Sequence, residues 1–167
     1  YYFDYGEVLA WGTFAQYFAV NLGMPALMAL GIRVSGASTF ADLLPLVVLT
    51  NGFLLGGLSV ILIGRLAAQL TRCERSGYLA AVIWTFIPWL VWLLFWLHPR
   101  SELMRMAYVP GIAWLQGSPD APGVFFALLG AYFLTVSLDS GHLRWPFLSG
   151  AAFGVMMLYR PHFAACV

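Results

Sequence analysis

Lysine is absent from this chain of 167 residues, and all eight basic side chains are arginine. Charged residues of both signs make up only 9% of the chain, whereas a soluble domain carries roughly a quarter. So few charges cannot solvate the surface of a water-soluble globule. The net charge is +1 and no basic residues form a run, which argues against nucleic acid as a partner.

Cysteine is scarce as well, and the familiar motifs of soluble enzymes are missing. Cys73 and Cys166 lie far apart and form no CxxC pair, so the pattern excludes a disulfide framework or a zinc site. The chain has no P-loop, no GxSxG or HExxH motif, and no GxGxxG followed by an acidic residue. Any chemistry must therefore use isolated polar side chains.

Apolar residues are abundant, at 62% of the chain, with a mean hydropathy of +0.84. A bilayer core about 30 Å thick requires about 20 apolar residues in a helix, and the apolar runs are too long for strands and lack their alternation. We predict an all-α fold, a polytopic transmembrane helix bundle with about four to five membrane helices in a single transmembrane region, 1–167. The predicted spans are 43–70, 78–97, 121–138 and 146–167, with a juxtamembrane or short helix at 19–33 and an external loop at 1–18.

The two ends of the chain lead to a further expectation. The chain starts at Tyr1 without methionine, stops at Val167 inside an apolar stretch, and has no signal peptide before its first apolar segment. We expect it to be the N-terminal part of a larger membrane protein.

Glycine pairs recur on two of the predicted spans. Gly52 with Gly56, and Gly150 with Gly154, have the GxxxG spacing that allows helices to approach closely. The pairs are explained by packing within the bundle, and a dimer face is the alternative.

The arginines suggest an orientation in the membrane. Arg65, Arg72 and Arg75 gather at the predicted loop 71–77, and Arg144 lies in the loop two spans later. Positive residues concentrate in cytoplasmic loops, so we predict that this side is cytoplasmic and that the loop between the second and third spans is external. The other four arginines fall on the opposite side, so the assignment depends on local density.

Acidic residues next to the predicted external ends of the spans are candidates for chemistry, because charges there are costly unless paired or hydrated. Asp4 and Glu7 lie three residues apart, so one helical face could carry both carboxylates as a general base or as ligands of a divalent cation. A solvated loop is the alternative. Asp120 precedes a span, where it could line a cavity or simply cap the helix.

Arg160 and His162 lie near the far end of the last apolar run. Arg160 could snorkel to the headgroups or bind a phosphate through its fork of donors. His162 could titrate near neutral pH or stay an uncharged interfacial side chain.

The order of these segments is itself informative. An acidic motif is followed by a proline-containing helix that ends in glycine, by two long spans, by an acidic residue entering a third span, and by a glycine-rich span closing on Arg-Pro. Here these parts read Asp4-Tyr5-Gly6-Glu7, Met24-Pro25-Ala26-Leu27 to Leu30-Gly31, Ser59 to Leu70, Tyr78 to Leu97, Ser118-Pro119-Asp120, and Gly150 to Gly154 followed by Arg160-Pro161. In this order the chain resembles the C-type membrane glycosyltransferases, relatives of the protein mannosyltransferases and aminoarabinose transferases. The usual Pro-Pro is absent, since Asn21-Leu22-Gly23 stands before the helix.

The resemblance implies an inverting enzyme that transfers a sugar from a polyprenyl-phosphate donor to a hydroxyl of a protein, lipid or glycan. Asp4 or Glu7 would be the catalytic base, and Asp120, Arg160 and His162 would bind substrate. A divalent metal ion is a possible cofactor, held by Asp4 and Asp120. The protein would belong to the cell envelope, in a bacterial inner membrane with its active face periplasmic.

A non-catalytic polytopic membrane protein, such as a transporter-like protein or an accessory subunit of a membrane complex, is the alternative. Intramembrane arginine and broken helices suit a carrier too. A preceding span and about half a dozen further spans in the flanking sequence would favour the enzyme.

Overall fold

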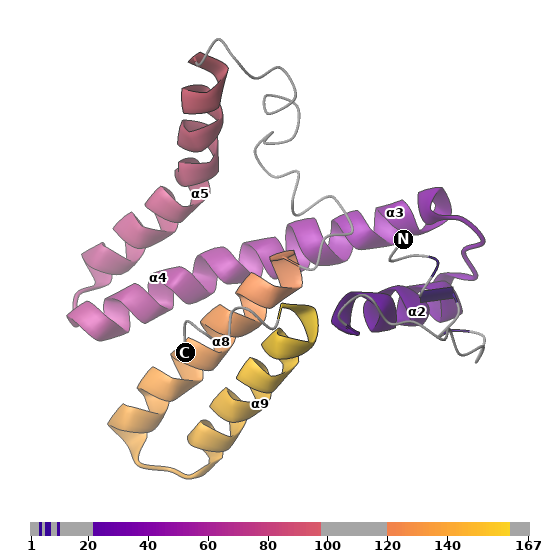
Figure 1. Cartoon of the computed structure of the whole chain (residues 1–167). Coiled ribbons are helices and arrows are strands. Elements are labelled where there is room, and N and C mark those ends of the chain that lie inside the picture. The colour runs from indigo at the N-terminus through magenta and orange to yellow at the C-terminus, as the bar shows by residue number, and fades with distance from the viewer. Residues whose placement is uncertain (1–3, 5, 8–9, 11–21, 98–119, 161–167) are drawn as a thin grey trace.

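The computed structural model describes residues 4, 6, 7, 10, 22–97 and 120–160, with the side chains of 91–92 and 95–97 excepted. Within these residues every regular element is a helix, as predicted for the fold class (Figure 1). His162, Cys166 and the segment 98–119 lie outside the described residues. Of the predicted external loop 1–18, the structure describes Asp4, Gly6, Glu7 and Ala10, which have helical backbone.

Helix α2 (Gly23–Ser35) buries one apolar face. Met24, Met28 and Ile32 follow one another at four-residue intervals, which places them on one side of the helix, and all three are buried. Gly36 ends the helix with φ of 68° and donates its N–H to the Ile32 carbonyl at 2.7 Å. This left-handed cap costs glycine little, so the chain turns here into the next helix.

The next helix is continuous from Phe40 to Thr71 but changes its winding. It comprises α3 (Phe40–Val47), the π-helical segment η1 (Val48–Gly56) and α4 (Gly57–Thr71). Thr39 begins it with a capping box, in which its side chain accepts from the Asp42 N–H and the Asp42 carboxylate accepts from the Thr39 N–H.

The π-helical segment follows Pro45, which has no N–H to donate within α3. Thr50 adds a side-chain hydrogen bond within this segment, since its hydroxyl donates to the Leu46 carbonyl at 2.8 Å. A side chain that inserts into the backbone ladder and a nearby proline are recognised causes of irregular winding. The segment also turns Asn51 inward, where it is completely buried.

Helix α5 (Glu74–Leu97) follows after only two residues, so the predicted loop 71–77 is shorter than expected. Arg72 makes the turn in the left-handed region with φ of 53°. Hydrogen bonds from the backbone and side chain of Ser76 lower the pKa of the exposed Cys73 thiol, with a smaller contribution from the Arg75 backbone. From this turn α5 runs away from the rest of the molecule (Figure 1).

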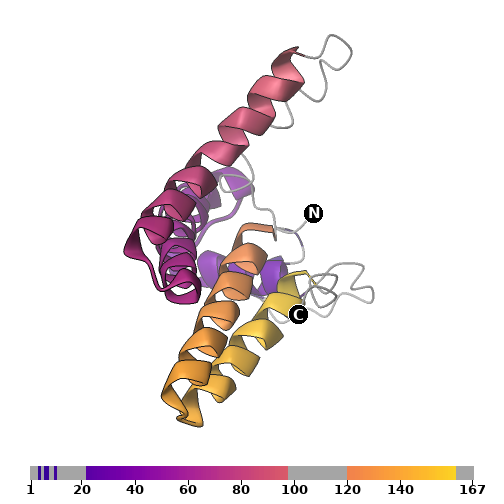
Figure 2. The ribbon, with the colours of Figure 1, turned by 90° about the vertical axis from the view of Figure 1, so that its left-hand side faces the viewer.

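Helices α8 (Asp120–Ser140) and α9 (Arg144–Tyr159) form an antiparallel hairpin (Figure 2). They touch closely at Gly130, where an added Cβ would lie 2.8 Å from the Phe153 ring. Ser149 donates its hydroxyl to the Gly130 carbonyl at 2.9 Å. The predicted span 146–167 extended further than α9 does, because Pro161 disfavours helical backbone at the residue before it.

Two of the described helices, Phe40–Thr71 and Asp120–Ser140, are long and apolar enough to cross a membrane. Only 17% and 28% of their most apolar windows are buried, unlike the core helix of a soluble protein. Large apolar side chains such as Phe53, Ile61 and Phe86 are exposed, and lipid is the environment in which such a surface is stable. The count of four to five spans stays a prediction.

Candidate functional site

Two of the predicted site residues meet where α8 begins and α9 ends. The Arg160 Nε atom lies 2.6 Å from Oδ1 of Asp120. The residues are distant in sequence, but the antiparallel hairpin returns the chain to its starting level. The structure therefore brings together the acidic residue that enters one predicted span and the arginine that leaves the next.

Local sequence fixes both positions. Asp120 is the first residue of α8, where its negative charge interacts favourably with the helix dipole. Arg160 directly follows α9 and has non-helical backbone (φ −145°, ψ 87°), while its N–H still donates to the Met156 carbonyl. Because Pro161 ends the helix here, Arg160 lies at the end of the hairpin rather than along its apolar side.

The ion pair is partly exposed. Arg160 is 28% exposed and Asp120 is 44% exposed, so solvent reaches the site and screens the attraction. The Nε atom is nevertheless buried, and among the described residues it makes no aligned hydrogen bond, despite its short distance to the carboxylate. The contact is thus an ion pair rather than a well-aligned hydrogen bond.

Tyr159 anchors this end of the hairpin to α2. Its ring stacks on Phe126 with the ring centres 6.0 Å apart and an interplanar angle of 14°. Gly23 also packs against it, so closely that an added Cβ would lie 2.8 Å from the Tyr159 ring. The start of α2 is therefore held directly beside Arg160.

The segment with the N-terminal acidic residues also packs against α2. Gly6 packs on α2, where an added Cβ would lie 2.5 Å from Met28 Cβ, and Arg33 Nε donates to the Ala10 carbonyl at 2.8 Å. Asp4 and Glu7 flank Gly6 and are exposed. Gly23 and Met28 are five residues apart on α2, about 7.5 Å along the helix axis. The acidic pair and the Asp120–Arg160 pair thus share one short helix as scaffold.

The divalent metal ion expected at Asp4 and Asp120 stays a prediction. The described residues contain no group of three His, Cys, Asp or Glu side chains that could hold a metal ion. The Oδ1 atom of Asp120 is already engaged by Arg160.

Some polar residues inside the apolar helices were not predicted as functional. The Asn51 amide and the Ser59 hydroxyl are completely buried and have no hydrogen-bond partner among the described residues. Gln69 joins α4 to α8, donating to Asp139 at 2.8 Å and accepting from Thr135 at 2.9 Å. The sequence marks each of these residues only as a polar residue within an apolar run. That pattern does not reveal which group, if any, each side chain bonds to.

Fold and site together define an all-helical protein with helices suited to a membrane and a charged pair at one end of a hairpin. Comparisons with protein-family models, curated proteins and solved structures found no match.

Proposed function

We propose that this protein is a membrane glycosyltransferase that transfers a sugar from a polyprenyl-phosphate donor to an acceptor hydroxyl at the external membrane face. The proposal depends on the order of sequence motifs and on one structural observation, the Asp120–Arg160 pair at the end of the α8–α9 hairpin. Arginine is suited to this task because its planar fork matches phosphate oxygens and stays charged.

In the proposed reaction Asp120 orients the Arg160 guanidinium by pairing with Nε. The guanidinium then binds the donor phosphate and stabilises the negative charge that grows as the bond between the anomeric carbon and the phosphate oxygen breaks. Asp4 or Glu7 removes the proton of the acceptor hydroxyl, whose oxygen forms the new glycosidic bond. Polyprenyl phosphate leaves with the bonding electrons, and the anomeric carbon inverts.

The arrangement of α2 supports the shared site. The same helix packs against Gly6 between the two acidic residues and against Tyr159 beside Arg160. A base and a phosphate-binding group must face the same substrate, and a rigid common support keeps their separation constant.

The decisive experiment measures transfer of a radiolabelled sugar from polyprenyl phosphate by the full-length protein in proteoliposomes. Loss of a charge-stabilising contact typically costs about 100- to 1000-fold in rate, so Arg160→Ala should abolish most transfer, and Arg160→Lys should recover part of it. Asp4→Asn and Glu7→Gln decide which acid is the base, because an amide cannot accept the proton.

Arg144→Ala is the matched control, since it also removes an arginine from the α8–α9 hairpin, but at the end opposite to Arg160. It should keep transfer within a few-fold of wild type. Wild-type rates in Arg160→Ala and in both carboxylate variants would mean that the charged residues are structural. The non-catalytic alternative would then be favoured.

A further inference from the structure

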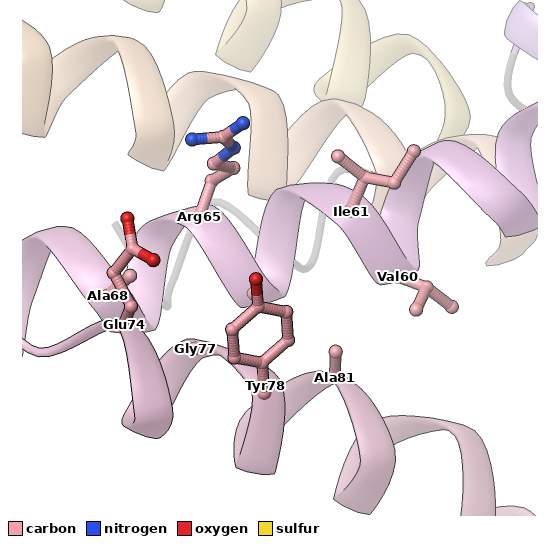
Figure 3. Close-up of a pocket in the computed structure, with 9 residues that line it drawn as sticks. Val60, Ile61, Arg65, Ala68, Glu74, Gly77, Tyr78 and Ala81 are labelled. Atoms are coloured by element: carbon pink, nitrogen blue, oxygen red, sulfur yellow. The ribbon is translucent and has the colours of Figure 1, made fainter.

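A second polar region lies at the turn between α4 and α5, away from the Asp120–Arg160 pair. A cavity of about 330 Å³ runs between the two helices, lined among others by Val60, Ile61, Arg65, Glu74 and Ala81 (Figure 3). Figure 3 shows Arg65 and Glu74 at one end of this groove and the apolar side chains at the other. The groove therefore has a charged end and an apolar end.

A second cavity of about 320 Å³ adjoins the charged end. It is lined by Arg65, Gln69, Arg72, Glu74 and Tyr132, among others, where α4, α5 and α8 meet. Two arginines against one glutamate leave a net positive charge around this cavity. Three of the lining residues, Arg65, Ala68 and Glu74, also belong to the groove, so the two spaces share a wall.

The groove lies beside a close crossing of the two helices at Gly64 and Gly77. An added Cβ at Gly77 would lie 2.5 Å from the Gly64 carbonyl oxygen, so the backbones are in contact there. Beyond this crossing α5 diverges from α4 (Figure 1). The apolar side chains next to the crossing, Ile61 and Tyr78, consequently stay exposed.

The expected depth of the groove in the membrane matches its charged and apolar ends. Arg65 lies six residues before Thr71, the end of a helix suited to crossing a bilayer, and thus about 9 Å from that end. An arginine at this depth can extend its guanidinium to the headgroup region. The apolar end of the groove lies farther toward the centre of the membrane.

We propose that the groove and the adjoining cavity bind one anionic phospholipid. Its phosphate contacts Arg65 and Arg72 in the polar cavity, and one acyl chain lies along Val60, Ile61 and Ala81 in the groove. The complementary charge selects an anionic headgroup, and the single apolar groove selects a ligand with a hydrocarbon chain. The site is independent of the proposed sugar transfer.

The test is competitive binding of phosphatidylglycerol and phosphatidylcholine with identical acyl chains to the full chain in mild detergent, measured by native mass spectrometry. Wild type should retain phosphatidylglycerol at least about five-fold more, the effect of about one arginine near a phosphate. Arg65→Gln and Arg72→Gln should each weaken retention about five-fold. Ala81→Leu should weaken retention of both lipids, because it fills the groove.

Arg144→Gln is the matched control. It removes one arginine from the same end of the molecule, near the α8–α9 turn, and lies outside both cavities. Its retention should equal that of wild type, and the circular dichroism of all variants should match.

Four outcomes would overturn the proposal. One is equal retention of the two lipids by wild type, and another is an equal loss in Arg144→Gln. Displacement of phosphatidylglycerol by millimolar inorganic phosphate would show a free-phosphate site instead. A second copy of the chain appearing in place of lipid would assign the groove to a dimer contact.

Discussion

Replacing Gly77 by alanine should destabilise the contact between α4 and α5. The new methyl carbon would lie 2.5 Å from the Gly64 carbonyl oxygen and 2.9 Å from the Ala68 Cβ, whereas ordinary contacts lie at 3.4–4 Å. Both neighbours are parts of the backbone or attached directly to it, so no side chain can rotate away. The helices must separate by roughly 1 Å, and overpacking of this kind costs about 1–3 kcal/mol.

Gly57→Ala is the matched control, because it is the same substitution in a helix but an added Cβ there meets nothing within 4 Å. Alanine is favoured over glycine in a helix by up to about 1 kcal/mol at both positions, so this gain cancels in the comparison. Gly77→Ala should therefore be less stable than Gly57→Ala by about 1–3 kcal/mol.

The assay is reversible unfolding in mixed micelles with increasing dodecyl sulfate, followed by circular dichroism. The free energy of unfolding is compared between the two variants and wild type. If Gly77→Ala were as stable as Gly57→Ala, the two helices would not touch through their glycines, and the groove beside the crossing would lose its basis.

Three further predictions follow from other contacts. Either single charge reversal, Asp120→Arg or Arg160→Asp, should lose about 1–2 kcal/mol of stability in the same unfolding assay, and the double variant should recover most of it. The double variant should not restore sugar transfer, and recovery of transfer would contradict the phosphate-binding role. Thr39→Ala should cost about 1 kcal/mol by removing the capping box, and an unchanged stability would show that the cap is not formed in solution. In a Cys166→Ala background, Cys73 should react with an impermeant maleimide only from the cytoplasmic side, and labelling from outside would overturn the orientation. Because the pKa of Cys73 is lowered, its thiolate forms at lower pH than that of an ordinary thiol, so its labelling rate should rise at lower pH than in the unfolded protein.

The helical elements were predictable because each apolar run is long enough to form a helix whatever its neighbours do. The exact ends of the helices were less predictable, because each end depends on a single residue. Gly36 and Arg72 end helices through left-handed backbone, and Pro161 ends α9 before the apolar run does. These residues act on the last turn only and leave the apolar pattern unchanged.

Close helix contacts could not be predicted from spacing within one helix. The GxxxG pair Gly150 and Gly154 faces open space among the described residues, while the tight crossing joins Gly64 of one helix to Gly77 of the next. The Gly52 and Gly56 pair falls in η1, where the winding departs from the α-helical spacing that the motif assumes. A glycine shows that a close approach is allowed, and only the path of the second helix decides whether it occurs.

The sequence predicted both members of the Asp120–Arg160 pair but not their direct contact. Asp120 and Arg160 were each selected as charges beside an apolar run, and antiparallel neighbours place such ends together. Their direct contact depends on the length of the turn 141–143 and on where α9 stops. The Arg33 contact with the Ala10 carbonyl had no sequence signal, since every residue carries a carbonyl.

The π-helical segment sets the rotational phase between the two halves of the Phe40–Thr71 helix. Each i→i+5 turn contains one residue more than an α-helical turn, so α3 and α4 present faces that a uniform α-helix would not align. If the same residues were wound as a uniform α-helix, each such extra residue would rotate all of α4 by about 100° relative to α3. Gly64 would then turn away from α5 and Gln69 away from α8, although neither lies within η1.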